Sequence, residues 1–296
     1  MTNNPIFRGA ATALITPMNE KGVDYDTFGR LIDWQIAEGI NALVIAGTTG
    51  ECSTLPDAEH KEVLRFSVER TAGRVPVIAG TGSNETAYAI ELTKFACDIG
   101  ADAMLVVTPY YNKATQNGLI KMYNTIADAS TKPIVVYNVP SRTGVSIEPA
   151  TYAALAKHPN IRAIKEANGD ISRIVETVSL VGDRLDLYSG NDDHIVPLMS
   201  MGGLGVISVL SNIMPAKTVE LCNRFLKGDV AGAAALQCEL TPLIKALFCE
   251  VNPIPVKAAM AAMGWGDDYL RSPLTPMEPA HREVLFAEMR KQGLPV

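Results

Sequence analysis

A chain of 296 residues, 47% hydrophobic and 20% charged, is long enough to bury one large core or two ordinary ones. Its formal net charge of −6 argues against a nucleic-acid partner, because phosphate binding needs clustered Lys and Arg side chains. No basic run is long enough to hold an anionic membrane surface, so we expect no membrane partner either.

The N-terminus and the cysteines favour a cytoplasmic protein. Residues 1–5 lack the charged-then-apolar pattern of a secretion signal, and we expect no apolar stretch of the roughly 18 residues that a membrane span needs. The five cysteines are scattered without a C-x-x-C pair, which suits reduced thiols better than a disulfide framework.

One pattern repeats along residues 1–228: an apolar, β-branched run ends in glycine, proline or a polar cluster, and a helical stretch follows. The runs are apolar almost throughout, as strands covered on both faces are. Eight such units predict a closed (β/α)8 TIM barrel, with an open doubly wound sheet as the alternative. The expected strands are Ala11–Pro17, Ala42–Gly47, Val75–Gly80, Ala103–Pro109, Pro133–Val139, Ile161–Glu166, Leu185–Gly190 and Gly205–Leu210.

The stretches between the runs have helical spacing. Thr54 is placed to cap the helix after the second strand, with Asp57 in the first turn of that helix. Farther along, Leu92, Phe95 and Ile99 fall on one helical face. Residues 229–296 contain no strand-like run, so we expect a barrel domain of residues 1–228 followed by a small C-terminal helical domain. Its three helices are Ala231–Leu247, Pro255–Met263 and Pro279–Lys291.

Lys165 lies near the end of the sixth expected strand, at the C-terminal barrel face where the active sites of this fold lie. Burial disfavours the charged form of a lysine, and an amine with a lowered pKa can form a Schiff base with a carbonyl substrate. A surface lysine that opens a loop is the alternative on residue type alone. The polar residues at the other strand ends decide between the two.

Those strand ends supply hydroxyl groups and carboxylate binders. If the face of the fifth strand that carries Tyr137 is interior, its hydroxyl points up the barrel axis, where Lys165 also points. Thr48 and Thr49 lie in a turn between glycines, whose amides suit a carboxylate, and Arg142 can bind one through two N–H groups. Each residue alone could be structural; together they predict a class I aldolase that acts on a 2-keto acid.

Other chemistries find little support in the sequence. The run Gly80–Glu85 starts like a dinucleotide fingerprint but has no third glycine, and no Walker-type G-K-[ST] occurs. The four histidines show no metal-ligand spacing, so we expect no metal site. We interpret two acidic residues near the strand ends, Glu51 and Glu166, as structural groups that hold neighbouring backbone.

From about Phe7 to Leu285 the chain resembles the 4-hydroxy-tetrahydrodipicolinate synthase (dihydrodipicolinate synthase) family, within the N-acetylneuraminate lyase superfamily. Residues 47–51 (Gly-Thr-Thr-Gly-Glu) and 137–140 (Tyr-Asn-Val-Pro), with Lys165, mark the superfamily. Three further segments are similar to the synthase in particular: residues 108–113, 141–144 and 252–257.

The resemblance implies a reaction and its substrates. Lys165 would form an imine with pyruvate, and the derived enamine would attack the aldehyde of L-aspartate 4-semialdehyde. Tyr137, Thr48 and Tyr111 match the proton relay of the family, in which the second tyrosine comes from a neighbouring subunit. The family is usually a homotetramer built as a dimer of dimers and needs no metal or organic cofactor. The remaining matches are Thr49 for the pyruvate carboxylate, Arg142 for the semialdehyde carboxylate, and Gly190 and Ile207 for the backbone that lines the pocket.

The resemblance also bears on regulation by lysine, which binds some family members at the dimer interface. Where lysine-sensitive members commonly have a histidine and a glutamate, this chain has Asp57 and Tyr88. A tyrosine cannot supply the charge that would hold a lysine amine, so we expect weak or absent inhibition. The positions that map to the effector site are Cys52, Ser53, Asp57, His60, Gly82, Asn84, Tyr88 and Tyr110.

Two alternatives stay open at this stage. A sister enzyme, such as an N-acetylneuraminate lyase or a 2-keto-3-deoxy-sugar-acid aldolase, would share Lys165 and Tyr137, but Arg142 and Tyr111 argue against it. A catalytically silent barrel that senses a keto acid is the other. Imine formation with pyruvate would separate an enzyme from a sensor.

Overall fold

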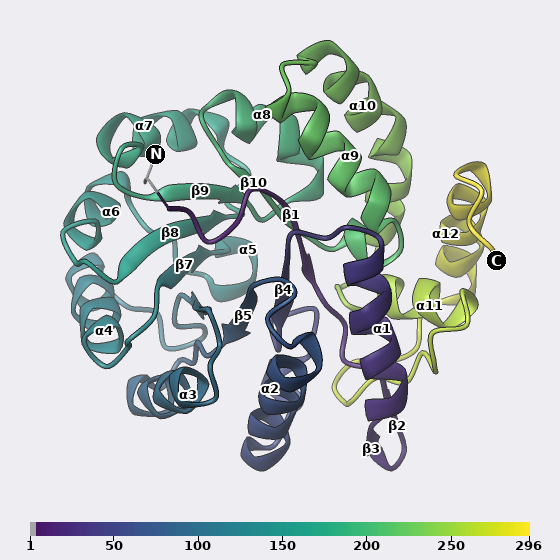
Figure 1. The fold of residues 1–296 in the computed structure, drawn as a ribbon, viewed down its shortest axis with the longest axis horizontal. Helices are drawn as coiled ribbons and strands as arrows, with labels where there is room; N and C mark the ends of the chain where they lie inside the picture. The colour runs from purple at the N-terminus through teal and green to yellow at the C-terminus, as the bar shows by residue number, and fades with distance from the viewer. Residues whose placement is uncertain (1–3) are drawn as a thin grey trace.

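A closed barrel of eight parallel strands lies at the centre of the computed structural model, which describes residues 4–296 (Figure 1). Each barrel strand pairs with the next along the chain, and β10 closes the barrel against β1. The expected (β/α)8 fold is therefore confirmed, and the open sheet is excluded. The barrel strands are β1 (Gly9–Ala13), β4 (Ala42–Ile45), β5 (Val77–Gly80), β6 (Ala103–Val107), β7 (Ile134–Asn138), β8 (Ile161–Glu166), β9 (Asp186–Ser189) and β10 (Gly205–Ser208).

The strand bounds differ from the expected ones mainly at the ends. β8 coincides with the expected run, whereas β1 begins at Gly9 and not at Ala11. A short antiparallel hairpin, β2 (Met18–Asn19) and β3 (Gly22–Val23), was not expected. Strands of two residues are too short to carry the alternation by which a strand is recognised.

Helices surround the barrel and cover the outer faces of its strands (Figure 1). Figure 1 shows α2 and α3 below the barrel and α6 and α7 to its left. The helices of this part are α1 (Tyr25–Ala37), α2 (Asp57–Thr71), α3 (Thr86–Asp98), α4 (Gln116–Asp128), α5 (Pro140–Thr143), α6 (Pro149–Leu155), α7 (Ile171–Val181), α8 (Ile195–Ser200) and α9 (Pro215–Leu226).

Thr54 does not cap α2, contrary to expectation. Its hydroxyl donates to the Glu51 carbonyl at 3.1 Å, and α2 begins at Asp57 after Pro56, which makes no side-chain cap. Thr54 ends a short 3-10 turn over Cys52–Thr54, and Leu55 and Pro56 lie between it and the helix. The hydroxyl therefore stabilises that turn, a competing local hydrogen bond of the kind that threonine readily makes.

Side chains alternate across the barrel wall and so form two apolar layers. In β7, Ile134 and Val136 pack outward with the helices, whereas Val135 and Tyr137 fill the barrel interior. Tyr188 of β9 belongs to the same interior layer. The face of β7 that carries Tyr137 is therefore interior, which was the condition for placing it beside Lys165.

Three helices follow the barrel: α10 (Val230–Leu247), α11 (Ile254–Ala262) and α12 (Pro279–Lys291). Within residues 4–296, α10 alone is long and apolar enough to cross a membrane, with 18 residues and a mean hydropathy of 1.2. The expectation that no stretch reaches that length is therefore wrong. In the structure α10 packs against α9 and α12 and buries Leu236 and Leu240, as a core helix does.

Candidate active site

Lys165 and Tyr137 lie together at the C-terminal end of the barrel. Lys165 is one residue before the end of β8, and its side chain is only 6% exposed. In the parallel register of β7 and β8 it pairs with Tyr137, and its Nζ lies 4.2 Å from the centroid of the tyrosine ring. The buried position predicted for Lys165 is confirmed, and the surface-lysine alternative is excluded.

The Lys165 amine is poised to lose its charge near neutral pH. Burial lowers its pKa to about 7, because little water remains to stabilise the positive charge. Asp192 acts in the opposite direction, and the Arg142 guanidinium adds to the lowering. A large part of the amine is therefore unprotonated at neutral pH, and that form attacks a carbonyl carbon.

Gly190, directly after β9, leaves room for the Lys165 side chain. A Cβ atom at this position would lie 3.2 Å from the Lys165 Cε and 2.9 Å from the Cβ of Ala167. The Gly190 N–H donates to the Glu166 carbonyl at 2.7 Å and so holds this backbone against β8. The close approach of the lysine side chain therefore requires a glycine here.

Tyr137 forms a hydrogen bond with Thr48, which comes from the turn after β4. Burial raises the pKa of the Tyr137 hydroxyl, so that it stays protonated and can donate at neutral pH. Ile207 of β10 lies in the same interior layer as the Tyr137 ring. Four elements thus bring together a nucleophilic amine, two hydroxyl groups and an apolar wall.

Thr49 and Arg142 are linked through Asn252, which lies in the segment between α10 and α11. The Asn252 Nδ2 donates to the Thr49 hydroxyl at 3.0 Å. The Arg142 guanidinium donates to the Asn252 carbonyl at 3.2 Å. Two residues proposed from the sequence as carboxylate binders therefore share one partner, which lies beyond the barrel strands in the chain.

The two acidic residues interpreted as structural hold backbone and neighbouring side chains. Glu166 accepts hydrogen bonds from the Asn138 amide, the Tyr152 hydroxyl and the Asn168 N–H. Its burial raises its pKa to about 7. Glu51 forms a fully buried ion pair with Lys257.

Asp192 is an acidic residue near Lys165 to which no role was assigned from the sequence. One of its carboxylate oxygens accepts from the Val209 and Leu210 N–H groups at 3.0 and 2.9 Å. Burial raises its pKa, and the Lys165 charge acts in the opposite direction. Its place in the short turn after β9 was the only available signal, since the fold and not a sequence motif brings the carboxylate near Lys165.

Tyr111 is the one predicted catalytic residue that the single chain does not bring to Lys165. Its side chain is 89% exposed, and its φ of +72° places it in the left-handed region. A tyrosine seldom adopts this conformation, so the backbone at the tip of this loop is strained. The loop therefore presents the ring outward, away from its own barrel.

Among the suggested regulatory positions, Asp57 and Tyr88 are in contact. Their side chains share a hydrogen bond. The Lys61 Nζ lies 2.9 Å from the Asp57 carboxylate and 2.5 Å from that of Glu91. The Asp57 carboxylate thus already forms an ion pair with the Lys61 ammonium group of the same chain.

The other suggested regulatory positions lie in α2 and in adjoining loops and turns. The His60 Nε2 hydrogen-bonds the Gly80 carbonyl at 2.9 Å, and the Asn84 amide donates to the Tyr110 carbonyl at 3.2 Å. Cys52 and Ser53 form the short turn before α2. Gly82 approaches β6 closely, since a Cβ there would lie 2.4 Å from the Val107 nitrogen.

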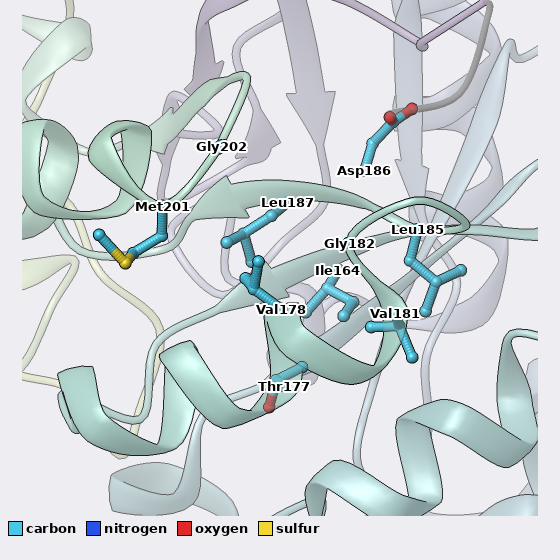
Figure 2. A pocket seen from close by; sticks show the side chains of 10 residues that line it. All are labelled: Ile164, Thr177, Val178, Val181, Gly182, Leu185, Asp186, Leu187, Met201 and Gly202. Carbon is cyan, nitrogen blue, oxygen red and sulfur yellow. The ribbon is translucent and has the colours of Figure 1, made fainter.

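A separate apolar cavity lies outside the barrel wall (Figure 2). Ile164 of β8, Leu187 of β9 and Val178 of α7 line it, and their side chains gather there in Figure 2. None of the residues discussed above as catalytic lines it.

Within residues 4–296, no group of three His, Cys, Asp or Glu side chains could hold a metal ion.

The chain matches known proteins along almost its whole length. A model of the dihydrodipicolinate synthetase family covers residues 6–292. The 4-hydroxy-tetrahydrodipicolinate synthase of Caldicellulosiruptor saccharolyticus is 54% identical over 291 residues, 98% of either chain. The solved dihydrodipicolinate synthase of Aquifex aeolicus is 44% identical with a TM-score of 0.96, covering 98% of this chain and 99% of that one. A monomeric dihydrodipicolinate synthase variant is 44% identical with a TM-score of 0.96 and covers 98% of each chain.

These matches cover the barrel and the C-terminal helices in one alignment. They include Lys165, the turn that carries Thr48, and the segment that carries Asn252, all within the span of the family model. With a matching fold, sequence identity near one half and a lysine buried at the barrel mouth, the chain belongs to the dihydrodipicolinate synthetase family.

Proposed function

We propose that this chain condenses pyruvate with L-aspartate 4-semialdehyde to give 4-hydroxy-tetrahydrodipicolinate, a step of lysine and diaminopimelate biosynthesis in the cytoplasm. The observation that carries the proposal is Lys165, buried beside the ring of Tyr137 with a pKa of about 7. The names of the matched relatives and structures support the same reaction.

The reaction begins with a covalent bond between Lys165 and pyruvate. The neutral Nζ adds to the ketone carbon, and one water leaves to give an imine. Loss of a proton from the methyl group gives an enamine, with the imine nitrogen accepting the electron pair. The enamine carbon then attacks the aldehyde carbon of the semialdehyde. Finally the semialdehyde's own amine displaces Nζ from the imine carbon, which closes the ring and frees the lysine.

Neutral hydroxyl groups carry the protons of these steps. Tyr137 keeps its proton because burial raises its pKa, and its hydrogen bond to Thr48 gives a partner that can both donate and accept. We assign Tyr111 of a second subunit to the outer end of this relay. The relay can then deliver a proton to the departing water and take one from the methyl group.

Two other residues hold the substrate carboxylates in this proposal. Thr49, in the turn after β4, donates to the carboxylate of pyruvate. Arg142 of α5 receives the carboxylate of the semialdehyde, for which a guanidinium is well shaped. The backbone at Gly190 and Ile207 lines the pocket between them. The relay and these contacts need no metal or organic cofactor, because the imine serves as the electron sink.

We further propose that the active protein is a homotetramer, a dimer of dimers. The outward Tyr111, 89% exposed, supports exchange of this side chain between two subunits. Ile171 and Val175 on α7 are also exposed apolar residues and suit a second contact. Residues 1–228 would carry the catalytic residues, and residues 229–296 would form a helical domain that packs against α9 and α8.

Turnover tests the proposed reaction directly. Pyruvate and L-aspartate 4-semialdehyde are supplied together, and product is coupled to a reductase that consumes NADPH. We expect turnover, together with an imine to Lys165 that borohydride traps in the presence of pyruvate. An imine without turnover would point to a sister aldolase and to sugar acids as the second substrate. The absence of both would contradict the proposed function.

Mixed oligomers test the shared site. A Lys165→Ala subunit and a Tyr111→Phe subunit are each expected to be poorly active alone. In a mixed dimer, one of the two sites regains an intact lysine and an intact tyrosine, so activity should return on mixing and re-association. If it does not return, although mass spectrometry shows that mixed dimers form, Tyr111 is not exchanged.

A further inference from the structure

Asn252 is buried at the active site, although the chain reaches it only after all eight strands and α10. Its side chain is 5% exposed, and its contacts go to Thr49 of the turn after β4 and to Arg142 of α5. Among the described residues of the segment between α10 and α11, Asn252 alone makes hydrogen bonds with the side chains of Thr49 and Arg142. The segment therefore contributes to the pocket as well as to the helical part of the chain.

The hydrogen bond to Thr49 has a defined direction. A side-chain amide nitrogen can only donate, so the Thr49 oxygen must accept from the Asn252 Nδ2. A threonine hydroxyl has one proton of its own, and that proton remains to be donated elsewhere. Thr49 is only 2% exposed, so little water competes for this proton.

A buried ion pair holds Asn252 in this place. The Lys257 side chain, in α11, pairs with Glu51, and both side chains are almost completely buried. The second carboxylate oxygen of Glu51 accepts a hydrogen bond from the backbone N–H of Arg271 at 3.2 Å. Glu51 lies in the same turn as Thr49, so the segment that carries Asn252 is fastened to the turn that it contacts.

We propose that Asn252 is a positioning residue, which orients the Thr49 hydroxyl so that its proton is donated to the carboxylate of pyruvate. The inference rests on the proposed function, because it takes Thr49 as the pyruvate-carboxylate binder. Asn252 itself touches neither the reacting carbons nor Lys165 in this account. Its carbonyl, which accepts from Arg142, belongs to the backbone and is kept in side-chain variants.

The variant Asn252→Asp gives the sharpest test. It has nearly the same shape, but it replaces the donor by an acceptor, so the Thr49 proton would turn toward residue 252 and away from pyruvate. We expect the KM for pyruvate to rise about ten-fold or more, with a smaller change in kcat. Asn252→Ala only frees the hydroxyl and should raise this KM less. A merely structural residue would show the reverse order, because aspartate fits the space better than alanine.

A double-mutant cycle separates orientation of Thr49 from direct charge repulsion. In a Thr49→Val background, Asn252→Asp should have little further effect on pyruvate KM, since no hydroxyl remains to be turned. The KM for the semialdehyde should stay within about two-fold in Asn252→Ala, because the carbonyl that holds Arg142 is unchanged. Val251→Ala, an exposed neighbour, serves as the matched control for changes in this segment.

Each outcome has a distinct meaning. An equal effect of Asn252→Asp in both backgrounds would overturn the inference. An unchanged pyruvate KM in Asn252→Asp would also overturn it, because it would mean that the side-chain oxygen of Asn252, and not its nitrogen, faces Thr49. Thermal unfolding of every variant checks the fold, and Asn252→Ala keeps the cycle complete if the aspartate variant does not fold. If the wild-type chain forms no borohydride-trapped imine with pyruvate, the proposed function fails first, and this inference fails with it.

Discussion

Tyr137 and Lys165 occupy paired positions on adjacent parallel strands, and the lysine amine lies over the face of the tyrosine ring, 4.2 Å from its centroid. The tyrosine hydroxyl is engaged with Thr48. Among the described residues no carboxylate forms an ion pair with the amine, and Asp192 favours its charged form only through space. Burial lowers the pKa of this lysine to about 7, so that it can be neutral near neutral pH.

Replacing Lys165 should abolish the reaction and stabilise the protein. For Lys165→Met we expect turnover to fall by at least about a thousand-fold, because no other residue can form the imine. The same change removes a buried ionisable group, so the protein should unfold at a higher temperature at pH 7. Turnover and thermal unfolding are measured on the same preparation, and near-normal turnover would sink the Schiff-base mechanism.

The stabilising effect of Lys165→Met should depend on pH. The folded-state pKa of Lys165, about 7, lies below the value of 10.5 for a free lysine. Between these values the unfolded chain binds more protons, so wild-type stability rises with pH. The advantage of the variant is therefore full below pH 7 and vanishes toward pH 10.5. A constant advantage across this range would contradict the lowered pKa.

Asp192 should set the pH at which Lys165 becomes reactive. Imine formation with pyruvate, followed by borohydride trapping, is expected to increase with pH through about 7 in the wild type. The Asp192 charge raises the pKa of Lys165, so Asp192→Asn should shift this midpoint to lower pH. Burial and Arg142, the other influences on this pKa, are unchanged in the variant. A shift to higher pH would refute the role of the carboxylate.

Gly190→Ala should impair catalysis by crowding the nucleophile. The added methyl group would lie within 3.2 Å of the Lys165 Cε, and the lysine must move to relieve the contact. We expect kcat/KM for pyruvate to fall by about ten-fold or more, with the barrel still folded. Gly118→Ala in α4 is the control, because its Cβ meets only ordinary contacts at 3.4 Å. Equal effects of both variants would argue against a local cause.

Arg142→Ala should separate the two substrates. The loss of a guanidinium–carboxylate contact is expected to lower kcat/KM for the semialdehyde by about ten- to a hundred-fold. Imine formation with pyruvate should change less, because it precedes semialdehyde binding. Steady-state kinetics and borohydride trapping measure the two effects. Equal damage to both would remove the role assigned to Arg142.

Lysine should inhibit this protein weakly or not at all. The Asp57 carboxylate is engaged by Lys61 and by Tyr88, and Tyr88 brings no charge of its own. Tyr88→Glu should therefore increase sensitivity to lysine, whereas Tyr88→Phe, which removes the hydrogen bond without adding charge, should not. Initial rates with added lysine test this. Inhibition of the wild type at micromolar lysine would overturn the expectation.

The parts that could be predicted from the sequence are those that depend on local patterns. Continuous apolar runs located the eight strands, and alternation put Tyr137 and Val135 on one face of β7; the structure shows that this face is interior. The role of Asn252 could not be found this way, because its contact with Thr49 joins residues 203 positions apart. The effect of Asp192 on Lys165 was equally hidden, since it acts through space between the turn after β9 and the strand β8.

The bond between Thr49 and Asn252 also bears on how the protein is made. A growing chain has all eight barrel strands once Ser208 has left the ribosome, but the partner of Thr49 and Arg142 is synthesised later. Folding during synthesis proceeds from the N-terminus. A truncated chain could therefore close its barrel and still lack an ordered carboxylate pocket, so catalytic competence comes only with the finished chain.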